Sequence, residues 1–136
     1  FLMWNGFGGG RRVNHMSLFI TLMRVPENII SIEDFTSDFV QEPLGSYAEV
    51  MSILRSLFPD ADYSDPTWIG VRSDELSEIS MEVEDPVYAL GFRNPSFQLI
   101  QKVFEKYGWR GIDPSSGQVI PPFIPPEYYG FPPQGS

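Results

Sequence analysis

The stretch SEISMEVEDPVYALGFRNPSFQLIQKVFEKYG, residues 77–108, decides the fold class. Within residues 77–84 apolar and polar side chains alternate, which is typical of a strand with one face in water. A second apolar run, residues 87–93, follows directly after Asp85-Pro86. Two such runs joined by a turn dipeptide predict an antiparallel hairpin.

The second half of this stretch predicts a helix. Its apolar residues recur at helical spacing: Phe97, Ile100, Val103, Phe104 and Tyr107. Asn94 is expected as the N-cap, with Pro95 at the first helical position, where its missing N–H costs nothing. Lys106 suits the helix dipole near the C-terminus, and Gly108 suits the residue that ends the helix.

A second helix is expected upstream, over residues 46–58. Ser46 and Glu49 have the spacing of a capping box, in which each side chain accepts a hydrogen bond from a backbone N–H at the helix start. One face is apolar, and Pro59 ends the helix. The two helices are therefore separated by the predicted strands.

The remaining elements are shorter. Residues 17–25 and 67–72 are rich in branched and aromatic side chains and are expected as strands. Residues 109–113 and 118–120 are expected as a strand and its return, and a short helix is predicted over 32–40. Strands grouped around two helices indicate an α+β fold with a mainly antiparallel sheet and two main helices on one face, loosely ferredoxin-like.

The 136 residues suit a single domain. We expect residues 1–15 to be a non-native or disordered leader, because they begin without Met and show no sustained period. Residues 16–120 are the predicted α+β domain. Residues 121–136, dominated by proline and aromatic side chains, are predicted to be an extended tail.

Several kinds of chemistry lack the residues they need. The chain has no Cys and one His, His15, so a histidine-dependent triad and the usual zinc sites are not expected. Residues 60–71 begin like a calcium loop, but Pro66 and Val71 break the frame. We expect neither a metal nor a cofactor, and a non-enzymatic role is favoured.

The formal charge of −9 is unevenly distributed. Between residues 60 and 85 one base, Arg72, accompanies nine acids: Asp60, Asp62, Asp65, Asp74, Glu75, Glu78, Glu82, Glu84 and Asp85. Such a field repels phosphate backbones and anionic lipid, so nucleic-acid and membrane partners are not expected. A solvated surface that maintains solubility is the simplest interpretation, and a cytoplasmic location fits.

The leading functional hypothesis is a binding protein for a basic protein partner, with an immunity or antitoxin-like role. Asp74, Glu75 and Glu78 are the predicted contacts within the acidic region. Phe123, Tyr128 and Tyr129 are the predicted contacts in the tail, which either docks on its own domain or joins two chains in a homodimer.

The alternative is a small-molecule-binding domain or minor enzyme with a pocket between sheet and helices. The candidate ligand-binding residues are Trp68, Arg72, Arg93, Trp109, Arg110 and Asp113. Each also has a purely structural interpretation. Trp109 can pack against the helix, Asp113 can cap its own turn, and the two strand-end arginines can pair with nearby carboxylates.

The segments ISMEV, PVYALGFR and GWRGIDPSSG, between residues 79 and 120, resemble small bacterial proteins of unknown function, including those carried as single genes on mobile integron cassettes. The resemblance implies a compact α+β domain. It implies no catalytic residues.

Overall fold

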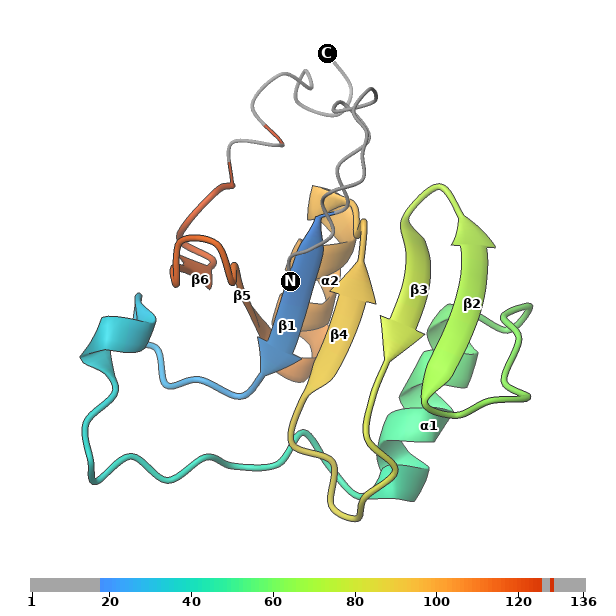
Figure 1. Cartoon of the computed structure of the whole chain (residues 1–136), viewed down its shortest axis with the longest axis horizontal. Helices are drawn as coiled ribbons and strands as arrows, with labels where there is room; N and C mark the ends of the chain where they lie inside the picture. The colour runs from blue at the N-terminus through green and yellow to red at the C-terminus, as the bar shows by residue number, and fades with distance from the viewer. Residues whose placement is uncertain (1–17, 126–127, 129–136) are drawn as a thin grey trace.

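The computed structural model describes residues 18–125 and 128. Its six strands are β1 (Phe19–Met23), β2 (Trp68–Ser73), β3 (Leu76–Ser80), β4 (Leu90–Arg93), β5 (Arg110–Ile112) and β6 (Val119–Ile120). They form one sheet in the order β2-β3-β4-β1-β5-β6, with every neighbouring pair antiparallel (Figure 1). The α-helices are α1 (Tyr47–Leu57) and α2 (Phe97–Tyr107). The α+β prediction is confirmed.

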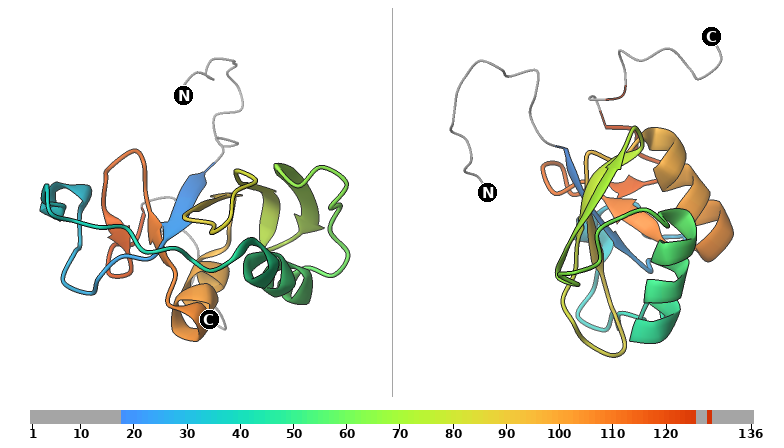
Figure 2. Two further views of the ribbon diagram at one scale, coloured as in Figure 1. Left: turned by 90° about the horizontal axis from the view of Figure 1, so that it is seen from below. Right: turned by 90° about the vertical axis from the view of Figure 1, so that its right-hand side faces the viewer.

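Both helices lie on the same face of the sheet, which we call the inner face (Figure 2). Alternate strand residues point toward them and are buried, as Ile20 and Leu22 of β1 illustrate. The main core between helices and sheet includes Leu54, Ile69, Ile79, Phe92, Leu99, Ile100 and Trp109. Apolar burial at this interface is the dominant stabilising contribution to the fold.

The two helices carry the predicted terminal signals. At α1 the Ser46 hydroxyl accepts from the Glu49 N–H at 3.1 Å, and the Glu49 carboxylate accepts from the Ser46 N–H at 2.8 Å. The capping box is therefore confirmed. At the end of α2, Gly108 adopts a left-handed conformation with φ 76°, which a residue without Cβ takes at little cost.

The predicted start of α2 was wrong by two residues. Ser96 is the N-cap, and its hydroxyl accepts from the Leu99 N–H at 3.0 Å. Asn94 instead extends the pairing of β4 with β1: its side-chain carbonyl accepts from the Leu18 N–H at 2.9 Å, and its own N–H donates to the Leu18 carbonyl. The contact with Leu18 therefore outweighs the preference of Asn94 for the N-cap position.

The predicted hairpin forms between β3 and β4, but its strands are shorter than expected. β3 ends at Ser80 rather than at residue 84, and Val83 is 57% exposed. The reason lies in Val87, whose N–H donates to the Gly45 carbonyl and whose carbonyl accepts from the Leu44 N–H. These two bonds draw the connection toward the start of α1 and away from the hairpin.

The other short elements follow the predictions in part. The helix expected over residues 32–40 is only the single turn η3 (Ile32–Asp34). The strand pair at 109–120 is present as β5 and β6, with Gly117 at φ 75° in the turn.

The opposite, outer face of the sheet is covered only in part (Figure 2). Over β1, β5 and β6 a second small core forms from Val25, Ile29, Ile112 and Val119, with Met23 and Phe35 packed against it. The chain after β1 is fastened there because the Val119 N–H donates to the Ile30 carbonyl. No equivalent layer of described residues covers β2, β3 and β4.

The described part of the tail returns to the domain. The Tyr128 ring lies 5.3 Å from the Phe97 ring, measured between centroids, and its hydroxyl donates to the Pro95 carbonyl at 2.5 Å. Phe123 is half-buried against the main core. Tyr129 and the predicted leader, residues 1–15, lie outside the described residues. A homodimer stays a prediction.

Candidate functional site

Three predicted residues meet on the bare part of the outer face. Trp68 begins β2, and Glu78 pairs directly with Arg93 across β3 and β4. The Trp68 Nε1–H donates to Glu78 Oε2 at 3.1 Å, and Arg93 Nε lies 3.2 Å from Glu78 Oε1. The Arg93 guanidinium carbon is 5.8 Å from the centroid of the Trp68 ring, within reach of a cation–π contact.

This arrangement holds the indole without covering it. Trp68 is 48% exposed although its N–H is bonded and its ring is flanked by a guanidinium. The ion pair itself is half-exposed, so its contribution to the free energy of unfolding is about 0.2–1 kcal/mol. Its main effect is to fix the orientation of an exposed aromatic side chain.

The surface beside Trp68 is open. A Cβ built on Gly70 would have no described atom within 4 Å, whereas one on Gly91 would lie 2.4 Å from the end of the Phe19 ring. The Phe19 ring thus fills the space above Gly91 and is itself 37% exposed. We call Phe19, Trp68, Gly70, Glu78 and Arg93 the Trp68 face.

Carboxylates lie at the edge of β2 and at the ends of β2 and β3, the strands that carry most of this face. We call the acidic flank Asp60, Asp62, Asp65, Asp74, Glu75, Glu82 and Glu84. The first three lie in the loop beside β2, which pairs with the strand through the Asp62 N–H and the Gly70 carbonyl. The next two form the β2–β3 turn, and the last two are exposed in the connection after β3 (Figure 1).

Two acids of this loop, Asp62 and Asp65, have lowered pKa values. Hydrogen bonds from the Ser64 N–H and hydroxyl lower the pKa of Asp62. The Thr67 hydroxyl and N–H do the same for the pKa of Asp65. Arg72, the one base of the region, is exposed and lowers the pKa of Asp62 slightly further through its charge.

Arg110 has a structural position under the loop that follows β1. It is 4% exposed, and its guanidinium donates to the carbonyls of Pro26 at 2.5 Å and Pro121 at 2.7 Å, with a longer contact to Val25 at 3.4 Å. Burial lowers its pKa, and the charge of Glu27 partly offsets the shift. The side chain therefore fastens the loop and the start of the tail to β5.

Trp109 and Asp113 also lie inside the domain. Trp109 is fully buried in the main core, with its ring 5.3 Å from that of Tyr107. The Asp113 carboxylate accepts from the Ser115 N–H and hydroxyl and from the Ser116 hydroxyl, so it caps its own turn. The structure thus brings Trp68 and Arg93 together but places Trp109, Arg110 and Asp113 elsewhere.

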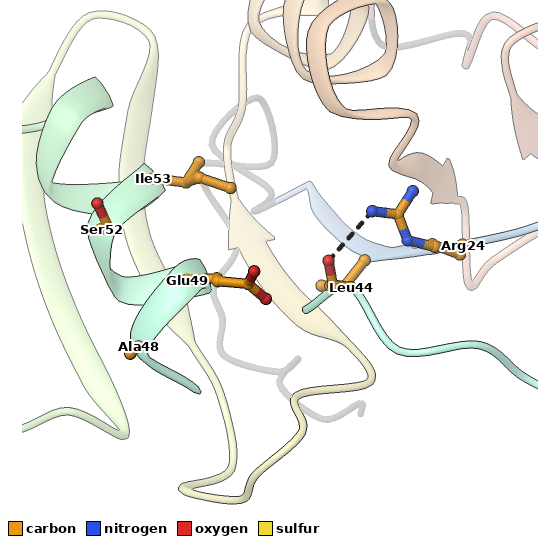
Figure 3. A pocket seen from close by; sticks show the side chains of 6 residues that line it. All are labelled: Arg24, Leu44, Ala48, Glu49, Ser52 and Ile53. Atoms are coloured by element: carbon orange, nitrogen blue, oxygen red, sulfur yellow. Dashed lines mark hydrogen bonds between the residues drawn. The ribbon is translucent and has the colours of Figure 1, made fainter. Parts of the chain in front are cut away.

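An open pocket of about 550 Å³ lies beside α1 on the side of the helices (Figure 3). It is lined by Arg24, Leu44, Ala48, Glu49, Ser52 and Ile53. Glu49 was predicted only as a capping residue, and no role was predicted for Arg24. No local pattern marks this arginine, because its surroundings come from three distant segments.

The described residues contain neither a metal-binding group of side chains nor a membrane-spanning helix. Within residues 18–125 and 128, no three His, Cys, Asp or Glu side chains are grouped closely enough to hold a metal ion. No helix in this part of the chain has the length and apolar character needed to cross a bilayer.

The resemblance of residues 79–120 to small bacterial proteins stays a prediction. Comparison of the chain with protein-family models, with curated proteins and with solved structures found no match.

Proposed function

We propose that this chain is a non-enzymatic binding protein that receives a basic protein segment on the Trp68 face. The observation that carries the proposal is the position of Trp68. It is a 48% exposed indole, held by Glu78 and Arg93 on a sheet face that no described layer covers. Carboxylates of the acidic flank lie in the loop beside β2, in the β2–β3 turn and after β3.

The negative charge of the acidic flank and the exposed Trp68 ring act at different stages of association. Negative charge of this density attracts a basic partner over a distance and raises the association rate, an effect that salt weakens. Tryptophan is enriched among the residues that contribute most to binding energy once the partner excludes water. A fixed ring also loses less rotamer freedom on binding than a mobile one.

The charge limits the class of partner. A net charge of −9, with nine of the 18 acids between residues 60 and 85, disfavours phosphate backbones and anionic lipid surfaces. An immunity or antitoxin-like role, in which the chain occupies the basic surface of another protein, suits this distribution. Glu78 acts indirectly in this proposal, because both of its oxygens already contact Trp68 and Arg93.

We further propose that the sheet is an elaborated ferredoxin-like arrangement. The four neighbouring strands β3-β4-β1-β5 support this, because α1 lies between β1 and β3 in the chain and α2 lies between β4 and β5. In this interpretation β2 and β6 are additional edge strands. An experimental structure with a different strand order would contradict it.

Binding of a fluorescent decalysine peptide tests the main proposal. The test variant, Asp74→Asn with Glu75→Gln and Glu82→Gln, removes three charges from the acidic flank. The control, Asp38→Asn with Glu33→Gln and Glu42→Gln, removes the same charge from exposed positions outside it. Anisotropy titrations at low and high salt give the affinity of each protein.

We expect the test variant to lose about tenfold or more in affinity at low salt, and the control to lose much less. Trp68→Ala should cost a further ~1–2 kcal/mol with a peptide that carries aromatic residues between its lysines. Equal losses in the two triple variants would show that net charge alone governs binding, and the proposal would be wrong.

A further inference from the structure

We propose that the pocket beside α1 binds a small zwitterion, a ligand with both a carboxylate and an ammonium group, such as a free amino acid (Figure 3). This inference goes beyond the binding function proposed above. Four of the residues that line the pocket belong to α1, which lies on the inner face of the sheet (Figure 2). Trp68 alternates along β2 with the buried core residue Ile69, so the Trp68 face lies on the opposite side of the sheet. The two sites are therefore separable by experiment.

Arg24 supplies the positive side of the pocket. Its Nε, Nη2 and Nη1 donate to the carbonyls of Pro43 at 2.9 Å, Leu44 at 3.2 Å and Tyr107 at 3.0 Å. These neutral acceptors fix the guanidinium but leave its charge in place. Arginine has five N–H donors, so the group retains capacity for a ligand. No carboxylate of the described residues forms an ion pair with it.

Glu49 supplies the negative side. Its Oε1 accepts from the Ser46 N–H at 2.8 Å, which fixes the carboxylate at the start of α1. Figure 3 shows the Glu49 side chain pointing from α1 toward Leu44 and the side on which Arg24 lies. Glu49 and Arg24 line the same open space and form no ion pair with each other. Two fixed and opposite charges thus face one pocket.

This pair of charges selects the ligand class. A simple carboxylate attracted by Arg24 is repelled by Glu49, and a simple amine meets the opposite conflict. A zwitterion can place each group against its complement through charge-assisted hydrogen bonds. Leu44, Ala48 and Ile53 offer aliphatic walls for a side chain. Because the pocket is open to solvent, we expect a dissociation constant on the order of a millimolar.

Leucine and its two truncated analogues provide the test. Isocaproate keeps the carboxylate and side chain of leucine but lacks the amine, and isoamylamine keeps the amine but lacks the carboxylate. Backbone amide shifts of the full chain would be followed by NMR as each probe is added. We expect leucine to shift the amides of residues 44–53 and to bind about tenfold more tightly than either analogue.

Variants of α1 locate the binding. Ala48→Phe should fill the pocket and abolish the leucine shifts, whereas Ser56→Phe, at an exposed position of the same helix outside the pocket, should not. Glu49→Gln keeps a cap acceptor but removes the charge, so it should weaken leucine binding and strengthen isocaproate binding. The melting temperature of each variant would confirm that it is folded.

Three results would each overturn this inference. The first is the absence of amide shifts with any probe at roughly tens of millimolar. The second is equal affinity for leucine and isocaproate, and the third is leucine binding that persists in the Ala48→Phe variant. Decalysine binding should be the same in Ala48→Phe and in the unmodified chain. Failure at this pocket would therefore leave the proposed function of the Trp68 face unaffected.

Discussion

The two faces of the sheet use tryptophan in opposite ways. Trp109 on the inner face is fully buried beneath the helices, whereas Trp68 on the outer face is 48% exposed and held by Glu78 and Arg93. Among the described residues, the helices cover the inner face, whereas the outer face is covered only over β1, β5 and β6. From this contrast we propose that the inner indole serves stability and the outer one serves recognition.

Replacing the two tryptophans should give the largest difference. Trp109→Ala removes a large side chain from the main core and should lower the free energy of unfolding by ~3–5 kcal/mol. Trp68→Ala should lower it by less than ~1 kcal/mol, because the side chain is already 48% exposed. Chemical denaturation of both variants measures these values. Similar losses would contradict the distinction between the faces.

Arg110→Met tests how the covered part of the outer face is held. The substitution keeps an unbranched side chain but leaves the carbonyls of Pro26 and Pro121 without their buried donor. We expect a loss of ~2–3 kcal/mol. The same measurement on Arg93→Met should show a loss below ~1 kcal/mol, since its ion pair is half-exposed.

Two glycines sharpen the comparison within the outer face itself. Gly91→Ala places a methyl group against Phe19 and Ser80 and should destabilise the domain by ~1–2 kcal/mol. Gly70→Ala meets no described atom and should stay within ~0.5 kcal/mol of the original chain. Thermal melts of the pair test this. A large loss at Gly70 would reveal a covering segment above it.

The smallest expected effect is on the pH dependence of the free energy of unfolding. Hydrogen bonds lower the folded-state pKa of Asp62 and of Asp65 below their ordinary value of 3.8. Their contribution to stability is therefore present above that value and is lost as the pH falls through the folded pKa. The double variant Asp62→Asn, Asp65→Asn should differ from the original chain most at neutral pH, and urea denaturation should show the difference in the free energy of unfolding narrowing as the pH falls below 3.8.

The sequence predicted what local chemistry determines. The capping box of Ser46 and Glu49, the glycine that ends α2 and the turn before β6 are encoded within a few residues, and the structure contains all three. Errors arose where distant backbone intervened. Asn94 forms hydrogen bonds with Leu18 of the neighbouring chain segment, so α2 begins later than predicted. Val87 forms hydrogen bonds with Leu44 and Gly45, so β3 ends and β4 begins at other residues than predicted.

The candidate site was less predictable for the same reason. Strand periodicity separates two faces but does not tell which one a helix covers. Trp68, Arg93, Trp109 and Arg110 were therefore grouped as one pocket, although the structure divides them between the two sides of the sheet and its covering loop. The pocket at Arg24 depends on contacts with Pro43, Leu44 and Tyr107, which no local pattern contains.

The most direct test of the account compares the indole N–H signals of Trp68 and Trp109 by NMR while a basic peptide is added. We predict that the Trp68 signal and the amides of β2 and β3 shift together and saturate, while the Trp109 signal stays in place. Shifts centred on the acids at Glu33, Asp38 and Glu42, with Trp68 unmoved, would contradict the claim that the outer face is the binding surface.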